Sequence, residues 1–281
     1  MAQGGYGDGT VDTVLSVDAV ASEAAALIEN RPTVEELDRL VKGDAVVRLE
    51  SIDAGYGRMQ ILHGFDLRVG AGQALCLIGP NGAGKSTVLH TIYGFTRVYG
   101  GKVHAGDADI TGLSSTRKLK QAGIAYILQD NSVFPDMTVE ENLFMGGYLL
   151  NNLDQARDAA ERILERYPRL KERRRQRAGV LSGGERRILE ITRALIMDPA
   201  VLLVDEPSIG LEPRFIDMVF ELLEDLKTKE NKTIIMVEQN AKKGLQFADI
   251  GYVLVSGQLA MAGTGDKLLN DPSVGRQFLG G

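Results

Sequence analysis

Nine consecutive residues have the types and the spacing of a phosphate-binding loop. Residues 79–87 read GPNGAGKST, which satisfies the pattern G-x-x-x-x-G-K-[ST]. Glycines let successive backbone N–H groups turn toward phosphate oxygens, the lysine supplies positive charge, and the serine hydroxyl can bind Mg²⁺. The candidate phosphate-binding residues are Gly79, Pro80, Asn81, Gly82, Ala83, Gly84, Lys85, Ser86 and Thr87. The alternative is a chance glycine turn, and four constrained positions argue against it.

Two adjacent carboxylates follow a second apolar run. Residues 201–206 read VLLVDE, and the four apolar residues predict a buried parallel strand. Asp205 and Glu206 would emerge at its carboxyl end, where open α/β sheets place their ligands. Asp205 is suited to hold Mg²⁺, directly or through water, and Glu206 to polarise the water that attacks a γ-phosphate. Alone, the pair would be a solvated turn; beside a phosphate loop it favours catalysis.

A second candidate anion site lies at residues 181–187, LSGGERR. Ser182 can cap the helix that follows, while Gly183 and Gly184, ahead of Glu185, leave the first amides accessible. On its own this pattern favours an ordinary capped helix after a glycine loop. Because one nucleotide rarely needs two such helix starts from one small domain, the second could serve a nucleotide held by another copy.

The flanking segments predict the elements that must position these residues. Residues 73–78, QALCLI, are strand-like and residues 86–94, STVLHTIYG, are helix-like, which is the order that a phosphate loop requires. Residues 232–240, KTIIMVEQN, begin as an apolar, β-branched run and end on three polar residues. A strand that ends in this way usually delivers its polar residues to a site.

Composition places the chain among ordinary globular proteins. It has 281 residues, of which 44% are hydrophobic and 25% charged. No stretch approaches the roughly 20 apolar residues that span a bilayer, and the start lacks the order of a secretion signal, so we expect the chain to stay in the cytosol. The single cysteine, Cys76, lies in an apolar run, which excludes an internal disulfide and favours a buried thiol.

The charges are distributed unevenly. Residues 1–44 hold nine acidic and three basic residues, which accounts for the net charge of −6, and the rest of the chain has 29 of each sign. The absence of net charge in residues 45–281 argues against a protein that binds nucleic acid by neutralising its phosphates. The basic run at residues 169–177 lacks interleaved aromatics, and we interpret it as a solvated, partly salt-bridged helix face. The three histidines, His63, His90 and His104, show no metal-ligand spacing and are expected to be structural.

The N-terminal segment has a helical pattern of its own. Apolar residues recur at spacings of three and four over residues 14–28, as on one helix face. Thr33 and Glu36 form a capping box that predicts a second, shorter helix. We expect an accessory pair of helices that packs on the body or on a partner, and a regulatory or docking arm stays open as the alternative.

The motifs together resemble the ATP-binding cassette (ABC) family over about residues 45–281. GPNGAGKST resembles its Walker A loop, LSGGE its signature, VLLVDEP its Walker B strand and Gln129 in YILQD its Q-loop glutamine, all in the family's order. The resemblance implies ATP and Mg²⁺ as ligands, with Gln129 beside Ser86 and Asp205 at the metal. It also implies that Tyr56 stacks on adenine, where a surface-turn tyrosine would otherwise be the simpler interpretation.

The resemblance further implies a fold and partners. The fold is α/β: a P-loop NTPase core with a mainly parallel sheet, an antiparallel β subdomain and a helical subdomain at about 130–185, after an acidic helical extension of residues 1–44. Two cassettes clamp two ATP molecules head to tail, so residues 182–185 would meet the nucleotide of a second copy or of a related cassette. Integral-membrane permease subunits and, indirectly, a solute-binding protein complete the assembly, peripheral at the cytoplasmic side of the plasma membrane. Nucleic acid is not an expected partner.

The segment after Gln129 mixes apolar bulk with loop residues. In transporters of this family it receives the coupling helices of the membrane subunits, and a small helical core is the alternative. We expect both, because some side chains must pack the helices while others meet a partner. The apolar residues are Val133, Phe134, Met137, Leu143, Phe144 and Met145.

Gln239 stands where many cassettes have a histidine that contacts the γ-phosphate. Its amide can donate to a phosphate oxygen but cannot exchange a proton near pH 7. We therefore expect Glu206 to act as the base, Gln239 as a γ-phosphate contact and Lys85 as a catalytic positive charge. With MVEQNA, GYVLVSGQLAMAG, LFMGGY, DEPSIGLEP and FLGG, the chain resembles LivF-type ATPases of branched-chain amino acid importers and related amide and urea importers.

The chain departs from the family pattern in two places. The first 44 residues are not part of the usual pattern, and Glu212 stands where many cassettes have Asp. Pro213 can open the next helix, with Glu212 favourably placed at its positive end.

Three alternative functions stay open. LSGGERR also resembles lipopolysaccharide-exporter ATPases, although Gln239 weighs against them. A non-transport cassette protein acting on ribosomes or DNA usually has two cassettes in one chain or a long coiled-coil insertion, and neither is seen. The third alternative is a structural subunit that binds ATP, which the filled catalytic positions disfavour. The residues do not identify the solute, which other subunits select.

Overall fold

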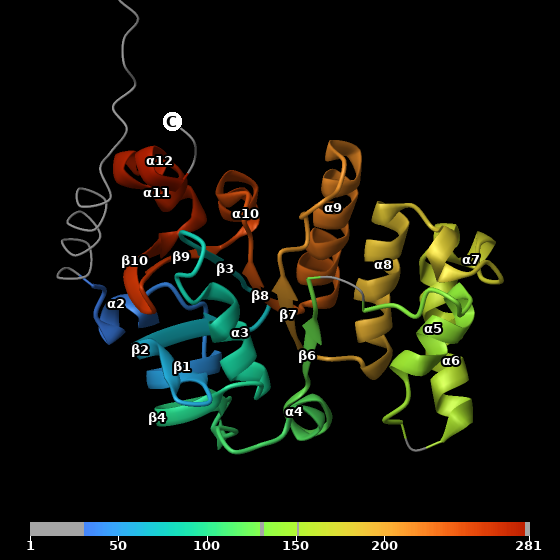
Figure 1. Cartoon of the computed structure of the whole chain (residues 1–281), viewed down its shortest axis with the longest axis horizontal. Helices are drawn as coiled ribbons and strands as arrows, with labels where there is room; N and C mark the ends of the chain where they lie inside the picture. Colours follow the sequence, from blue (N-terminus) through green and yellow to red (C-terminus); the bar gives the residue numbers. More distant parts are fainter. Residues whose placement is uncertain (1–30, 130–131, 151, 279–281) are drawn as a thin grey trace, which may run out of the picture.

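A six-stranded sheet forms the centre of the part of the chain that the computed structural model describes, residues 31–129, 132–150 and 152–278 (Figure 1). Its order is β10-β9-β3-β8-β7-β6, and neighbouring strands are parallel except for β9 and β10. The strands are β3 (Ala74–Ile78), β6 (Ile124–Ile127), β7 (Val201–Asp205), β8 (Thr233–Val237), β9 (Ile250–Val255) and β10 (Gln258–Thr264). Strands β3, β7, β8 and β9 are buried throughout, which explains their continuous apolar runs. The predicted mainly parallel core is confirmed.

A second sheet, antiparallel throughout, covers the helix that follows the phosphate loop. Its order is β2-β1-β4-β5. The elements are β1 (Ala45–Tyr56), β2 (Met59–Gly70), β4 (Arg97–Ala105), β5 (Ala108–Asp109) and helix α3 (Lys85–Tyr93). Side chains from both sheets and from α3, among them Leu49, Leu67, Leu75 and Val88, form one apolar cluster. The predicted antiparallel β region near the start of the cassette is therefore present.

A group of helices lies beyond edge strand β6 (Figure 1). They are α5 (Val139–Gly146), α6 (Leu153–Arg166), α7 (Pro168–Glu172), the 3₁₀ turn η1 (Ala178–Val180) and α8 (Gly183–Ala194). Helix α5 begins at a capping box of Thr138 and Glu141, and α6 begins at a cap from Asn152. Their apolar faces join a second cluster with the other side of the large sheet.

The remaining helices connect the strands and close the C-terminal end. They are α4 (Ser115–Ala122), η2 (Leu195–Met197), α9 (Pro213–Glu230), α10 (Ala241–Phe247), α11 (Gly265–Leu269) and α12 (Pro272–Phe278). Helix α9 has Pro213 in its first turn and Glu212 as its N-cap, as predicted. Within the described ranges, no helix has the length and apolarity that crossing a membrane requires.

The second of the two predicted N-terminal helices is present as α2 (Val34–Asp38). Thr33 and Glu36 form the predicted capping box. Leu37 is fully buried in the cluster that includes the small sheet, and the Gln73 side chain donates to Leu40 O at 3.0 Å. Helix α2 thus packs on the body. The first predicted helix, over residues 14–28, lies outside the described residues.

The basic run at residues 169–177 is salt-bridged, as predicted, but it is not one helix face. Helix α7 ends at Glu172 and turns follow it. Arg173 pairs with Glu185 at 2.9 Å, and Arg174 pairs with Glu140 and Glu161. The chain has to turn here because Arg177 bridges back to Thr138, at the start of α5.

Candidate nucleotide-binding site

The phosphate loop lies between β3 and α3, as predicted. Gly79 has φ +145°, and a Cβ there would lie 2.2 Å from Leu254 O, so only glycine fits. Gly84, with φ +97°, precedes the first residue of α3, and no side chain of the described residues caps that end of the helix. The first amides of α3 and the helix dipole are therefore free for an anion.

Lys85 folds back over the loop. Its Nζ donates to Gly79 O at 2.9 Å and to Pro80 O at 3.0 Å. Burial lowers the pKa of Lys85, and the carboxylates of Glu206 and Asp205 oppose that shift. The ammonium thus lies in the field of both carboxylates, within the loop that would receive the phosphates.

Asp205 contacts the hydroxyl of Ser86, which the sequence predicted as its partner at the metal. Ser86 Oγ donates to Asp205 Oδ1 at 3.1 Å, and Tyr126 Oη donates to Oδ2 at 2.7 Å. A hydroxyl and a carboxylate at the start of a phosphate-binding helix are the hard oxygen ligands that Mg²⁺ takes beside phosphate. The donor set therefore fits this cation.

Gln129 and Glu206 meet, although they follow different strands. Gln129 Nε2 donates to Glu206 Oε2 at 3.1 Å. Glu206 has φ +43°, a backbone conformation that non-glycine residues rarely adopt, and its N–H donates to Val237 O at 2.9 Å. The strained backbone turns Glu206 off the end of β7 toward the segment that follows β6.

The register of the parallel strands brings Gln239 to the same edge. Leu77 is paired with Val237, and Val237 with Asp205. The residues that follow each strand, including Gln239, therefore emerge beside the phosphate loop and the two carboxylates. Gln239 is exposed there.

Tyr56 ends β1 and is 42% exposed, so part of its side chain is accessible to a ligand. Its hydroxyl is hydrogen-bonded to Nδ1 of His90 on α3, and His90 packs in turn against Tyr126. An aromatic chain therefore leads from Tyr56 to the residue that binds Asp205.

The signature segment begins α8 with the predicted cap. Ser182 Oγ accepts from the N–H of Glu185 at 3.3 Å, and the Glu185 carboxylate accepts from the N–H of Ser182 at 3.0 Å. Gly184 has a packing role as well, because a Cβ there would lie 2.2 Å from the ring of Phe215 on α9. In Figure 1, α8 and α3 lie on opposite sides of β7 and β6. The two helix starts are therefore separate within one chain.

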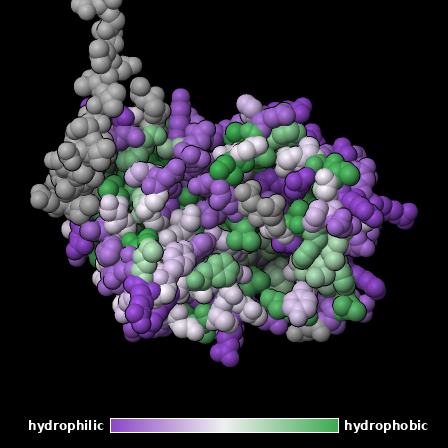
Figure 2. Space-filling view, viewed as in Figure 1, coloured by the Kyte–Doolittle hydropathy of each residue, from purple (hydrophilic) through white to green (hydrophobic). Residues whose placement is uncertain are grey.

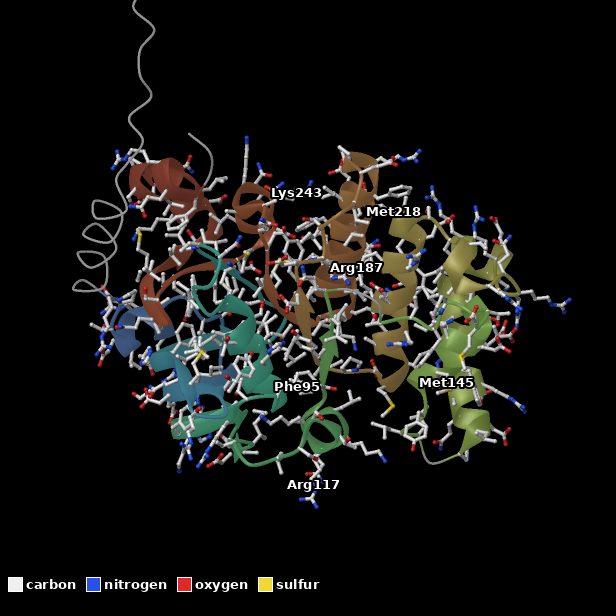
Figure 3. The ribbon with its side chains drawn as sticks, viewed as in Figure 1. Phe95, Arg117, Met145, Arg187, Met218 and Lys243 are labelled. Atoms are coloured by element: carbon white, nitrogen blue, oxygen red, sulfur yellow. The ribbon has the colours of Figure 1, made fainter. Side chains whose placement is uncertain are left out.

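Arg187 on α8, labelled in Figure 3, links three of these segments. It is 4% exposed and pairs with Glu190 at 2.9 Å. Its guanidinium donates to Leu128 O at 2.6 Å, to Gln129 O at 3.3 Å and to Asp205 O at 3.0 Å. The signature helix is thus tied directly to the Q-loop and to the end of β7.

Sequence reasoning gave no individual role to Tyr126, Arg187 or Glu238, although Arg187 and Glu238 lie in segments that it named as candidates. Each of the three is a polar residue inside or beside an apolar run and next to a recognised motif. Tyr126 lies three residues before Gln129, and Glu238 directly precedes Gln239. That adjacency was the available signal, but it does not show which segment each side chain contacts.

The apolar residues after Gln129 differ in burial, and Met137 and Phe144 are half-buried. Val133 and Leu143 are buried in the helical cluster, whereas Phe134 and Met145 are 44% and 36% exposed. Hydrophobic side chains gather around a hollow in Figure 2, which lies between Phe95 and Met145 as labelled in Figure 3. Phe134 and Met145 are thus left available to a partner.

Comparisons with known proteins agree with this geometry. The family described as ABC transporter matches residues 62–209. The high-affinity branched-chain amino acid transport ATP-binding protein BraG of Pseudomonas aeruginosa is 42% identical, over 84% of this chain and 100% of the relative. The probable branched-chain amino acid transport protein LivF of Archaeoglobus fulgidus is 37% identical, over 80% and 94%. The lipopolysaccharide export protein LptB of Haemophilus influenzae is 30% identical, over 84% and 98%.

Solved structures give the same result. A nucleotide-free ATP-binding cassette from an ABC transporter has a TM-score of 0.73 at 30% identity, over 82% of this chain and 97% of that one. A structure of the ADP conformation of an ABC transporter cassette has a TM-score of 0.74 at 29% identity, over 85% of this chain and 100% of that one. The chain belongs to the ABC transporter family, as a nucleotide-binding ATPase subunit.

Proposed function

We propose that this chain hydrolyses ATP with Mg²⁺ in a dimer of cassettes and thereby drives import of branched-chain amino acids or a related small polar solute. The observation that carries the proposal is the convergence of Ser86, Gln129, Asp205 and Glu206 at one edge of the sheet. The printed functions of BraG and LivF support the choice of solute. LptB makes lipopolysaccharide export the second candidate, and Gln239 weighs against it.

The proposed roles follow from the contacts. Ser86, Asp205 and Gln129 would hold Mg²⁺, which when bound neutralises charge on the phosphates. Glu206 accepts a proton from the attacking water, and its hydrogen bond with Gln129 orients its carboxylate. Lys85, together with the backbone N–H groups of residues 79–87, stabilises negative charge on the phosphates.

The remaining assignments complete the site. Tyr56 stacks on adenine, and Gln239 donates to the γ-phosphate without taking up a proton. Residues 182–185 bind the nucleotide of a second cassette, which completes each site. We keep the division into an acidic extension of residues 1–44 and a cassette of residues 45–281, with a helical subdomain at about 130–185, as part of the proposal.

The proposed partners are a second cassette, permease subunits in the membrane and, through them, a solute-binding protein, with this chain peripheral at the cytoplasmic side. The exposed side chains of Phe134 and Met145 support a permease contact, since apolar residues left uncovered on a helical surface favour a protein partner. The near balance of charge in residues 45–281 supports the absence of nucleic acid among the partners.

Affinity capture of the tagged full chain from detergent-solubilised membranes of its own cells tests this proposal. Wild type should recover polytopic permease subunits and a second cassette. Phe134→Asp should lose the permease subunits while ATP hydrolysis by the purified chain stays unchanged, because Phe134 lies outside the phosphate loop. Val34→Asp, at a residue of similar exposure (39%) on α2, should behave as wild type. Recovery of ribosomal proteins, or of a homodimer without any membrane protein, would overturn the transport proposal.

A further inference from the structure

Glu238 is a buried carboxyl that the proposed reaction does not use. It follows β8, directly before Gln239, and is 2% exposed. Its Oε1 accepts from Ser208 Oγ at 2.7 Å and from the N–H of Asn240 at 2.9 Å. Its Oε2 is buried without a hydrogen-bond partner among the described residues. Burial raises the pKa of Glu238, and the hydrogen bonds from Asn240 and Ser208 oppose that shift.

The packing around Glu238 leaves its carboxyl little room to move. Gly244 on α10 faces it, and a Cβ at that position would lie 3.0 Å from Glu238 Cβ and 2.7 Å from Cys76 Sγ. The backbone N–H of Glu238 donates to Leu77 O at 3.4 Å. The carboxyl is therefore confined between β3 and α10, and its bonded oxygen is directed at Ser208 and Asn240.

The two bonded segments are the ones that carry the proposed catalytic residues. Ser208 lies two residues after Glu206, and Asn240 directly follows Gln239. A buried carboxyl costs free energy unless its partners compensate, so an apolar residue would serve better if packing were the only role. Here the cost is offset by the Ser208 bond, which joins the segment after β7 to the segment after β8, and by the Asn240 bond within the segment after β8.

We propose that Glu238 is a positioning residue that fixes Gln239 relative to Glu206 through its bonds to Ser208 and Asn240, and so sets the rate of hydrolysis without touching ATP. This inference rests on the proposed roles of Glu206 and Gln239. When the carboxyl is removed, the phosphate loop still binds nucleotide, but the attacking water loses its aligned partners.

The test measures kcat and KM for ATP with the full-length chain and four variants. Glu238→Ala should lower kcat by about tenfold or more while KM changes less than about twofold, as expected when alignment rather than binding is lost. Glu238→Gln should restore kcat to within about threefold of wild type, because its amide oxygen can accept the same two bonds. Ser208→Ala should lower kcat, and the Ser208→Ala/Glu238→Ala double variant should be no slower than Glu238→Ala, because the bond that Ser208→Ala breaks is already lost in Glu238→Ala.

Lys232→Met provides the structural control. Lys232 lies at the other end of the segment that forms β8, is 8% exposed and pairs with Asp198. Lys232→Met should lower the free energy of unfolding, as Glu238→Ala should, but leave kcat unchanged. The inference is overturned if Glu238→Ala keeps the wild-type kcat, if kcat falls only in proportion to the folded fraction, or if Glu238→Gln is as slow as Glu238→Ala.

Glu206→Gln, measured in the same assay, distinguishes a failure of the positioning role of Glu238 from a failure of the proposed base role of Glu206. If Glu206→Gln hydrolyses ATP at the wild-type rate, the proposed base is wrong and the positioning role falls with it. If Glu206→Gln is inactive while Glu238→Ala is as fast as wild type, only the positioning role is wrong.

Discussion

At the residue scale, the proposed chemistry depends most on Glu206, whose backbone is strained and whose carboxylate is hydrogen-bonded to Gln129. Glu206→Gln keeps the size of the side chain but removes the proton acceptor. We expect steady-state hydrolysis to fall by about 100-fold or more while ATP binding is retained. Phosphate release measured against time, with ATP affinity measured separately, checks both halves of this expectation.

Glu221→Gln is a suitable control for that experiment, because Glu221 is an exposed carboxylate on α9, away from the phosphate loop. Its rate should match that of wild type. Retained hydrolysis in Glu206→Gln would contradict the assignment of the base, and a loss of ATP affinity would show that Glu206 acts in binding instead.

Candidate site residues could be predicted from the sequence where all the residues of a motif lie in one short segment. The phosphate loop and the pair of Asp205 and Glu206 each occupy a few consecutive positions, so residue type and spacing were sufficient. The bonds that join segments could not be predicted. The hydrogen bond from Tyr126 to Asp205 and the one from Arg187 to the Q-loop backbone depend on the register of strands that are far apart in the sequence.

At the element scale, the strands β3, β7 and β8 and the capped starts of helices α8 and α2 were predicted correctly. Strands β3, β7 and β8 are buried on both faces, and the caps at Ser182 and Thr33 are local hydrogen bonds within four residues. The basic run was assigned wrongly beyond Glu172, because the turn there is imposed by pairing with the start of α5. The local conformational preferences of residues 169–177 do not reveal a contact with a segment that is distant in the sequence.

Helix α4 is connected to the phosphate-binding helix by one buried lysine. Lys118 Nζ donates to Ile92 O at 2.7 Å and to Thr91 O at 3.3 Å, at the C-terminal end of α3. Lys118→Met keeps the apolar stem but leaves those carbonyls without their donor. We expect the free energy of unfolding to fall by about 1 to 3 kcal/mol. Denaturant unfolding of wild type and variant measures the change, and Lys120→Met, at an exposed position on α4, should change it little.

The same variant gives a pH test. Burial lowers the pKa of Lys118 from an ordinary value of 10.5 to about 8. The contribution of Lys118 to stability is fully present above 10.5, which is the pKa of its side chain in the unfolded chain. It is lost as the pH falls from there through about 8, because in that range the unfolded chain binds the proton more readily than the folded chain does. The difference between wild type and Lys118→Met should therefore be larger near pH 9.5 than near pH 7. A difference that is independent of pH would contradict the lowered pKa.

At the scale of the whole molecule, the N-terminal segment is joined to the cassette by α2 rather than merely preceding it. Leu37 packs in the apolar cluster that includes the small sheet. Asp38 forms an ion pair with Arg68 at 3.4 Å, and Lys42 forms one with Asp249 at 3.0 Å. Arg68 itself is nearly buried and donates to Leu49 O at 2.7 Å. These contacts anchor the segment from Leu37 to Lys42 to the same body that contains the candidate nucleotide-binding site.

Leu37→Ala tests that anchoring. Because Leu37 is fully buried, its truncation should lower the free energy of unfolding of the full chain by about 2 to 5 kcal/mol, through lost apolar contact and the cavity left behind. Val34→Ala on the same helix, at an exposed position, should cost far less. Equal, small effects of both variants would mean that α2 is an appendage. A large effect of Leu37→Ala alone, in one cooperative transition, means that α2 folds as one unit with the cassette.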